Sequence, residues 1–435
     1  MVEITLEDIK SFSKEYNDNP TNKIIENAIA NNGLENTMLN RDVIIENQPV
    51  FNIELPESKR YDQKDSYKCW IFAGFNLIKY NMAKNLNIDV KDLQLSSNYI
   101  SFFDRLEKAN ALYNQIIELE NVDFDYLEKY KIWECVGEET GYWEFFKSIV
   151  LKYGLVPYTY MPDTKESINV NRITTIYTEK VSKDIIKLIT LKNKNTDKKE
   201  LENEVKKYLF ENYNILSKIL GEPSKNFDFE YKDKENKYHI YKNMTPIEFR
   251  DKFLTLNLED FVNIGNIPKH NKEYNKIYKR NNYKHLGEMK LLNLPIHYLK
   301  DLAIQQLKEG NPVYMGIYVM QFRNKKSGIL DTRLFDYDNI LGIQSLTKEE
   351  GLNIGKIKMH HFMSITGVHL INEKPIRWKV EDSYGDKEKV NGCYVMNDNY
   401  FDKYVFDVII NKKYLPNELI ELLQQQPITY IDEVF

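Results

Sequence analysis

Apolar side chains recur at helical spacing along the first third of the chain and predict several helices. An amphipathic helix is expected near the N-terminus, and residues 68–88 are apolar on nearly every side, which is typical of a buried helix. A second helix is predicted to begin with a serine cap just after Leu95. A third is predicted from Trp143 to Tyr153, with Gly154 ending it.

The segment from about 165 to 285 has a helical and highly charged pattern with one interruption. Residues 227–231 alternate strictly between apolar and polar, a polar turn follows, and residues 238–241 complete a predicted hairpin. The mixed-sign run over residues 192–200 is expected to be an exposed loop between two helices.

Short apolar runs with strand character replace the helical pattern after about residue 310. Helices first and strands afterwards indicate an α+β chain with segregated halves. Five strands are predicted, over residues 312–319, 359–371, 377–381, 392–396 and 405–410.

The composition narrows the class of protein without assigning a function. The chain has 435 residues, a formal net charge of −5 and a pI of about 6.0, with 42% apolar and 29% charged residues. This length suggests two or three domains. The net negative charge argues against a protein that attracts nucleic acid or anionic membranes through an overall positive charge. Three cysteines are too few for a disulfide framework, and we see neither a secretory signal nor an apolar run of about 18 residues. We therefore expect a cytoplasmic protein with no membrane segment.

Cys69 is the first candidate for chemistry because it stands at the start of the predicted buried helix. A thiolate at a helix N-terminus is stabilised by the positive end of the helix dipole and by free backbone N–H groups. The alternative is that Cys69 is only a small core residue. Cys135 and Cys393 lack such a context, and we expect both to be structural.

A cysteine nucleophile needs a base and a group that orients the base. His361 lies on a predicted apolar strand, where a buried structural histidine is an equally good interpretation. Asp382 follows the strand over 377–381, where it could also be a turn former. The remaining histidines with polar surroundings are expected at the surface: His239, His270, His285 and His297.

Taken together, in the order Cys69, His361, Asp382, these residues resemble the catalytic residues of papain-like cysteine peptidases. The segment from Gln63 to Trp70 is similar to the active-site segment of that family. The match is most specific to the branch of bleomycin hydrolase and aminopeptidase C, and it runs from about residue 60 to about 425. The segments that carry the closer resemblance are Leu95–Asp104, Lys152–Thr164, Met244–Phe249, Gly328–Asp336 and Phe401–Phe406.

The resemblance implies a two-lobed papain-like fold, α+β in class, with a helical insertion. Residues 1–165 would form an N-terminal arm and a helical lobe that carries the nucleophile. Residues 166–290 would form a helical and hairpin insertion that builds the oligomer, a homohexamer in this family. Residues 291–435 would form a β-rich, barrel-like lobe with the base, its orienting residue and a C-terminal arm.

The resemblance also implies a role for each site residue. Cys69 would be the nucleophile, His361 the base and acid, and Asp382 the residue that orients His361. Gln63 would lend its side-chain amide to the oxyanion hole, together with the Cys69 backbone N–H. Gly141 would offer its backbone to the substrate strand, which suits a residue without a Cβ. The implied activity is that of a thiol aminopeptidase that hydrolyses peptides stepwise from the N-terminus through an acyl-enzyme.

Several positions depart from the family pattern. Asp382 stands where the family has an asparagine, and Tyr384 where it has the tryptophan that shields that asparagine. Tyr67 replaces a glycine two residues before the nucleophile, and the segment around Tyr142 is also altered. Tyr67 and Tyr142 are therefore candidates for substrate contacts that shape the pocket.

The C-terminal arm is shorter than the family's and ends at Phe435. In the family the arm lies in the cleft, and its carboxylate holds the α-ammonium of the substrate. A carboxylate of Phe435 in that position would make the protein an aminopeptidase. An arm that leaves the cleft open would make it an oligopeptide endopeptidase instead.

Two functions of other classes compete with a peptidase. A binding protein on a catalytically inactive peptidase scaffold would explain the unusual pocket residues, but the retention of Gln63, Cys69 and His361 together opposes it. Nucleic-acid binding is known in one branch of the family; the acidic pI weighs against it, although the lysine-rich segment 269–284 remains a local candidate. No phosphate-binding loop or metal-ligand spacing is visible, so we expect no cofactor and no metal.

Overall fold

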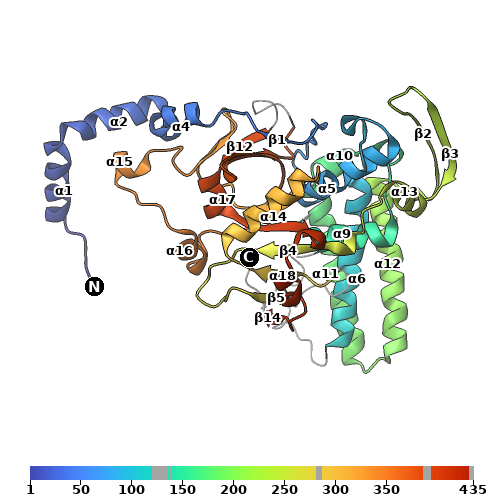
Figure 1. Cartoon of the computed structure of the whole chain (residues 1–435). Helices are drawn as coiled ribbons and strands as arrows, with labels where there is room; N and C mark the ends of the chain where they lie inside the picture. Colours follow the sequence, from blue (N-terminus) through green and yellow to red (C-terminus); the bar gives the residue numbers. More distant parts are fainter. Residues whose placement is uncertain (120–135, 137–139, 281–286, 386–392, 431–435) are drawn as a thin grey trace.

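The computed structural model describes residues 1–119, 136, 140–280, 287–385 and 393–430. Its N-terminal part is mostly helical (Figure 1). The three helices predicted there are confirmed as α5 (Cys69–Leu86), α6 (Ser97–Glu118) and α9 (Trp143–Tyr153). The Ser96 side chain caps α6 by accepting from the Tyr99 N–H. Gly154 ends α9 with a φ of 83°, a left-handed conformation that favours glycine.

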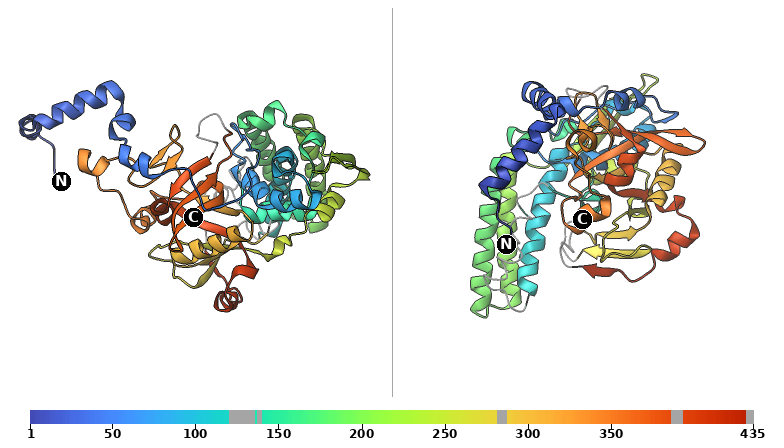
Figure 2. Two further views of the ribbon diagram at one scale, coloured as in Figure 1. Left: turned by 45° about the horizontal axis from the view of Figure 1, so that its top comes forward. Right: turned by 90° about the vertical axis from the view of Figure 1, so that its left-hand side faces the viewer.

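The predicted loop and hairpin of the middle segment are also confirmed. Two long antiparallel helices, α11 (Asn171–Asn193) and α12 (Lys198–Leu220), are joined by the charged loop and pack on α6. Figure 2 shows these three helices side by side, next to the sheet. The hairpin follows as β2 (Phe227–Lys232) and β3 (Tyr238–Met244). Two short helices flank these elements, α10 (Lys165–Ile168) and α13 (Pro246–Phe253).

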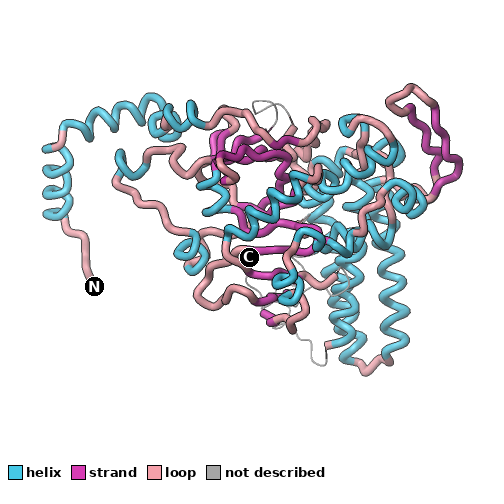
Figure 3. The backbone as a smooth tube through the Cα atoms, viewed as in Figure 1, coloured by secondary structure: helices cyan, strands magenta, loops and turns pink. Residues whose placement is uncertain are grey.

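One sheet gathers twelve strands of the described chain, and Figure 3 shows it in the middle of the molecule with helices on either side. Its order is β14-β5-β6-β4-β13-β7-β10-β11-β12-β9-β8, and β1 pairs with β10. The strands are β1 (Ile53–Glu54), β4 (Phe261–Gly265), β5 (Lys276–Arg280), β6 (Lys290–Asn293), β7 (Val313–Ile317), β8 (Arg323–Asn324), β9 (Ile329–Leu330), β10 (His361–Ile371), β11 (Lys374–Glu381), β12 (Cys393–Asn397), β13 (Val405–Asn411) and β14 (Ile428–Tyr430).

The prediction of a helical insertion as far as residue 290 is wrong for its last part. Strands β4 and β5, which lie inside that range, join the large sheet rather than the helices. Each is only five residues long, and both pair with segments far along the chain, so local periodicity could not identify them. The division into three domains stays a prediction, because one continuous hydrophobic core includes residues from both halves.

Helices of both halves cover the sheet. Helix α5 packs on β10 and β7, and α14 (Ile296–Lys308) packs on β13 and β10. The side chains of Trp70, Trp143 and Trp378 are fully buried in the core. The shorter helices of the C-terminal half are α15 (Tyr337–Leu341), α16 (Lys348–Asn353), α17 (Asp398–Tyr404) and α18 (Asn417–Leu422).

An N-terminal arm extends away from the rest of the molecule (Figures 1 and 2). It consists of α1 (Leu6–Asp18) and α2 (Pro20–Asn32), which have no buried residue, followed by α3 (Leu34–Met38) and α4 (Arg41–Glu46). The expected amphipathic helix is therefore present, but none of the described residues covers its apolar face. The large apolar side chains exposed on α1 and α2 are Leu6, Ile9, Phe12, Tyr16 and Ile24.

None of the described helices combines the length and the apolar character that a membrane crossing requires.

Candidate active site

Cys69 is the first residue of α5, so its thiol lies at the positive end of the helix dipole. The residue is 8% exposed, which leaves the sulfur shielded but reachable. The backbone turns into the helix through Tyr67, whose φ of 55° is left-handed. This conformation explains why the resembling family has a glycine at that position. Tyr67, two residues before Cys69, is 57% exposed.

His361 begins β10, on the strand against which α5 packs, and it is buried. Its Nε2 lies 2.8 Å from the Asp382 Oδ1, and Asp382 follows directly after β11, the antiparallel neighbour of β10. With Nε2 bound to the carboxylate, Nδ1 is the ring nitrogen left to face Cys69. The fold thus brings together Cys69 at the start of α5, His361 at the start of β10 and Asp382 just after the end of β11.

The charges around His361 favour its protonated form. Burial of the ring acts to lower its pKa, but the negative charges of Asp382 and of the Cys69 thiolate, with their hydrogen bonds, outweigh burial and raise the pKa of His361 to about 10. An imidazolium next to a thiolate is the arrangement of an activated cysteine nucleophile.

Gln63 is buried and held by the residue that follows Asp382. The Ser383 hydroxyl donates to the Gln63 Oε1 at 2.6 Å, and the Gln63 backbone N–H donates to the Ser383 carbonyl at 2.6 Å. The Gln63 amide oxygen is therefore occupied, while its Nε2 donates to no group of the described residues. Ser383 also donates its backbone N–H to the Asp382 Oδ1 at 2.7 Å. One serine thus links the amide of Gln63 to the carboxylate that binds His361.

Tyr384 covers the base. Its ring stacks on the His361 ring with centroids 5.8 Å apart and planes inclined by 20°. Burial, with the nearby charges of Asp382 and Cys69, raises the pKa of Tyr384 to about 12, so its hydroxyl stays neutral around pH 7. The tyrosine therefore shields the ion pair in the place of the family's tryptophan.

Gly141 and Tyr142 directly precede α9, and Gly141 lies against the residue that follows Cys69. A Cβ on Gly141 would come within 2.4 Å of the Trp70 ring, so only glycine lets the backbone lie against the residue that follows Cys69. Tyr142 packs edge-on against Phe362, and its hydroxyl accepts from the Arg280 Nη1 at 2.7 Å.

The C-terminal segment runs towards this same side of the site. Strand β14 pairs in parallel with β5, and Tyr430 is in register with Arg280, the residue that binds Tyr142. Phe435, and with it the predicted carboxylate contact, lies outside the described residues.

A buried ion pair joins α5, which carries Cys69, to β11, which ends just before Asp382. Lys79 follows Cys69 by ten positions on α5, and its Nζ lies 3.7 Å from the Glu381 Oε2. The Ser58 hydroxyl bridges the two by accepting from Lys79 and donating to Glu381. Burial lowers the pKa of Lys79, against the charge of Glu381. Sequence reasoning missed Lys79, Arg280 and Ser383; only Ser383 carried a local signal, since it is adjacent to Asp382.

The other candidates of the sequence analysis are more easily placed. Cys393 is buried on β12, and burial raises the pKa of its thiol to about 11, which suits a structural residue. Cys135 lies outside the described residues. His239 is half-buried and bound to Asp233 at 2.7 Å rather than freely exposed. Within the described ranges, no group of three or more His, Cys, Asp or Glu side chains is arranged to hold a metal ion.

Comparison with known proteins gives one consistent result. The family model described as the Peptidase C1-like family matches residues 3–432. Aminopeptidase E of Lactobacillus helveticus is 35% identical over 98% of this chain and 97% of its own length, and aminopeptidase C of Listeria monocytogenes is 33% identical over 98% and 96%. The crystal structure of PepW from Lactobacillus rhamnosis HN001 superposes with a TM-score of 0.94 at 34% identity, covering 99% of this chain and 98% of that one.

Proposed function

Because the chain belongs to the Peptidase C1-like family, we propose that it is a thiol aminopeptidase in which Cys69, His361, Asp382 and Gln63 carry the reaction. The two relatives named above are aminopeptidases and match this chain over nearly their whole length, and the papain-like α+β fold is that of PepW. The observation that carries the proposal is the convergence of a helix-start thiol, a base with a raised pKa and a fixed amide donor in one site.

The proposed reaction proceeds in two steps. The Cys69 thiolate attacks the carbonyl carbon of the peptide bond, and the developing oxyanion accepts hydrogen bonds from the Gln63 amide and the Cys69 backbone N–H. The His361 imidazolium then gives its Nδ1 proton to the leaving amine. In the second step, neutral His361 takes a proton from water, which attacks the thioester and releases the acid. Asp382 keeps the ring aligned throughout and stabilises its charge.

The preference for free N-termini is proposed to come from the C-terminal segment. The course of β14 beside β5 and Arg280 supports a terminal carboxylate of Phe435 near Tyr142 and Gly141, where it would bind the α-ammonium of the substrate. An oligopeptide endopeptidase of the same family is the second candidate, and the exposed Tyr67 at the nucleophile favours it, because an altered pocket wall could admit internal peptide bonds.

Hydrolysis of free-amine and N-blocked versions of the same peptide tests the proposal. An aminopeptidase should cleave the free-amine peptide far faster, whereas an endopeptidase should cleave both. Labelling of Cys69 by an epoxide inhibitor of papain-like peptidases, with Cys69→Ser as the control, distinguishes both from an inactive scaffold. A protein that cleaves neither peptide and does not react with the epoxide would refute the proposal.

Self-association into a homohexamer in the cytoplasm is the remaining part of the proposal. Exposed apolar side chains on the helical insertion, namely Ile176, Ile186 and Phe210, and those of the N-terminal arm support contacts between copies. Light scattering of the full chain and of a variant without residues 1–32 tests the assembly, and cell fractionation tests the location.

A further inference from the structure

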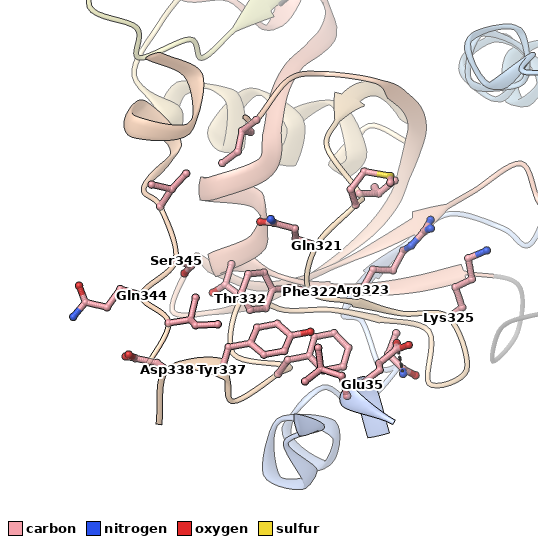
Figure 4. A pocket seen from close by; sticks show the side chains of 18 of the residues that line it. Glu35, Gln321, Phe322, Arg323, Lys325, Thr332, Tyr337, Asp338, Gln344 and Ser345 are labelled. Carbon is pink, nitrogen blue, oxygen red and sulfur yellow. Dashed lines mark hydrogen bonds between the residues drawn. The ribbon is translucent and has the colours of Figure 1, made fainter. Parts of the chain in front are cut away.

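A cavity of about 950 Å³ opens beside the catalytic strand (Figure 4). We call it the basic cavity, because four basic residues line it, Arg323, Lys325, Lys326 and Lys356, against two acidic ones, Glu35 and Asp338. The Glu35 carboxylate accepts from the Asn324 amide at 3.3 Å. The described carboxylates form no ion pair with Arg323, which is half-buried. A half-buried cation without a carboxylate partner points to an anionic ligand.

The basic cavity lies next to the candidate active site, as three observations show. His361 is in register with Ile317, and the chain beyond Ile317 passes directly into the cavity wall at residues 319–326. Residues 356–357, five and four positions before His361, form another part of the wall. Finally, the Lys325 ammonium lies 5.9 Å from the centre of the Tyr384 ring, which itself stacks on His361.

The position of the basic cavity identifies which part of a substrate would reach it. Its wall contains no residue of the Gly141–Tyr142 segment, of β5 or of β14, where the N-terminal part of the substrate is proposed to lie. A leaving peptide that extends from the site away from that segment would reach the basic cavity. The Tyr384 ring lies between the Lys325 ammonium and the His361 ring, so these two groups are at most about 12 Å apart. An extended peptide of three to four residues, at ~3.3 Å each, spans that distance.

Local hydrogen bonding and packing fix the backbone that carries Arg323 and Lys325. Arg323 is the first residue of β8, and Lys325 lies in the turn that joins β8 to β9 in a short hairpin. The residue before them, Phe322, is buried with a left-handed φ of 51°, and its ring packs against those of Phe335 and Tyr337. A non-glycine residue in this conformation is uncommon and is retained where the surrounding packing enforces it.

We propose that the basic cavity binds the leaving part of the peptide, and that Arg323 and Lys325 recognise its free C-terminal carboxylate. The inference rests on the proposed peptidase function and adds a substrate class to it: short peptides, with a leaving segment of about three or four residues, that end in a free carboxylate. Charge at this distance acts on binding and on the rate of encounter, so the preference should weaken as salt is added.

The test compares a tetrapeptide with a free C-terminus and its C-terminal amide, with an aminoacyl coumarin amide as a reference that has no leaving peptide. We expect the wild type to favour the free acid by about fivefold in kcat/KM at low salt. Lys325→Gln and Arg323→Gln should bring this ratio close to one, whereas Arg323→Lys should restore most of it. Lys84→Gln, an exposed lysine at the end of α5 that lines a different cavity, is the matched control and should keep the wild-type ratio.

Two results would overturn the inference while leaving the peptidase function intact. One is a wild type that cleaves the acid and the amide at equal rates. The other is a preference that persists in both glutamine variants or that does not respond to salt. A wild type that cleaves none of the three substrates would overturn the peptidase function, and the inference with it.

Discussion

Replacing Asp382 by asparagine should move the alkaline limit of activity to lower pH. Asparagine keeps an oxygen for the 2.8 Å contact with the His361 Nε2 and for the Ser383 N–H, but it removes the negative charge. The active ion pair needs His361 protonated, and that form is lost as the pH rises through the raised pKa of about 10. Without the Asp382 charge the same loss should occur at lower pH.

The size of the shift follows from the geometry of the pair. At an effective dielectric constant of about 20, two charges ~4 Å apart interact by about 4 kcal/mol, which is equivalent to roughly three pKa units. The hydrogen bond and the Cys69 thiolate remain in the variant, so we expect the alkaline limb to fall by roughly one to three units. Because the thiol and imidazole titrate as a coupled pair, the limb reports a macroscopic value for the pair.

The assay is kcat/KM against pH with an aminoacyl coumarin amide for the wild type, Asp382→Asn and Asp382→Ala. Asp382→Ala should lose far more activity at every pH, because the ring is then unoriented. Asp301→Asn, the same change at an exposed position of α14, is the control and should reproduce the wild-type profile. Superimposable profiles for all three active-site forms would refute the role given to Asp382.

Three further predictions concern the nucleophile, the oxyanion donor and the C-terminus. Cys69→Ser should keep the fold, as judged by circular dichroism and thermal melting, and lose peptidase activity; normal turnover would exclude the thiolate mechanism. Gln63→Ala should lower kcat by roughly 10²-fold with little change in KM, and Ser383→Ala should lower it by less, because the amide is then present but no longer fixed; an unaltered kcat in both would remove Gln63 from the reaction. Deleting residues 428–435 should raise cleavage of N-blocked relative to free-amine peptides, and an unchanged ratio in the truncated enzyme would show that this segment does not select free N-termini.

Local sequence patterns predicted the parts of the fold that local physics determines. The end of α9 at Gly154 and the capped start of α6 at Ser96 depend on residues within a turn of each boundary, so the sequence carries the signal. Strand β4 could not be predicted in the same way, because its pattern of five residues is equally compatible with a helix. It becomes a strand through pairing with β13, nearly 150 positions away.

The candidate site was partly predictable for a related reason. Cys69 and His361 were identified by the motifs around them, which lie within a few residues of each. The hydrogen bond from Ser383 to Gln63 joins positions 320 residues apart, and no spacing along the chain announces it. Tyrosine itself gives no sign of the left-handed backbone at Tyr67, and the glycine of the resembling family at this position was the one signal of it.

The bonds made by Ser383 have a consequence for how this enzyme can be altered. Its hydroxyl holds Gln63, the proposed oxyanion donor, and its backbone N–H holds the Asp382 carboxylate, which binds His361. Any change that shifts Ser383 moves both the Gln63 amide and the Asp382 carboxylate. The fold-losses in kcat/KM from Gln63 and Asp382 substitutions should therefore combine to less than their product in the double variant. The strand end that carries Asp382 and Ser383 therefore cannot be exchanged for that of a relative, in a chimera, unless the segment around Gln63 is exchanged with it.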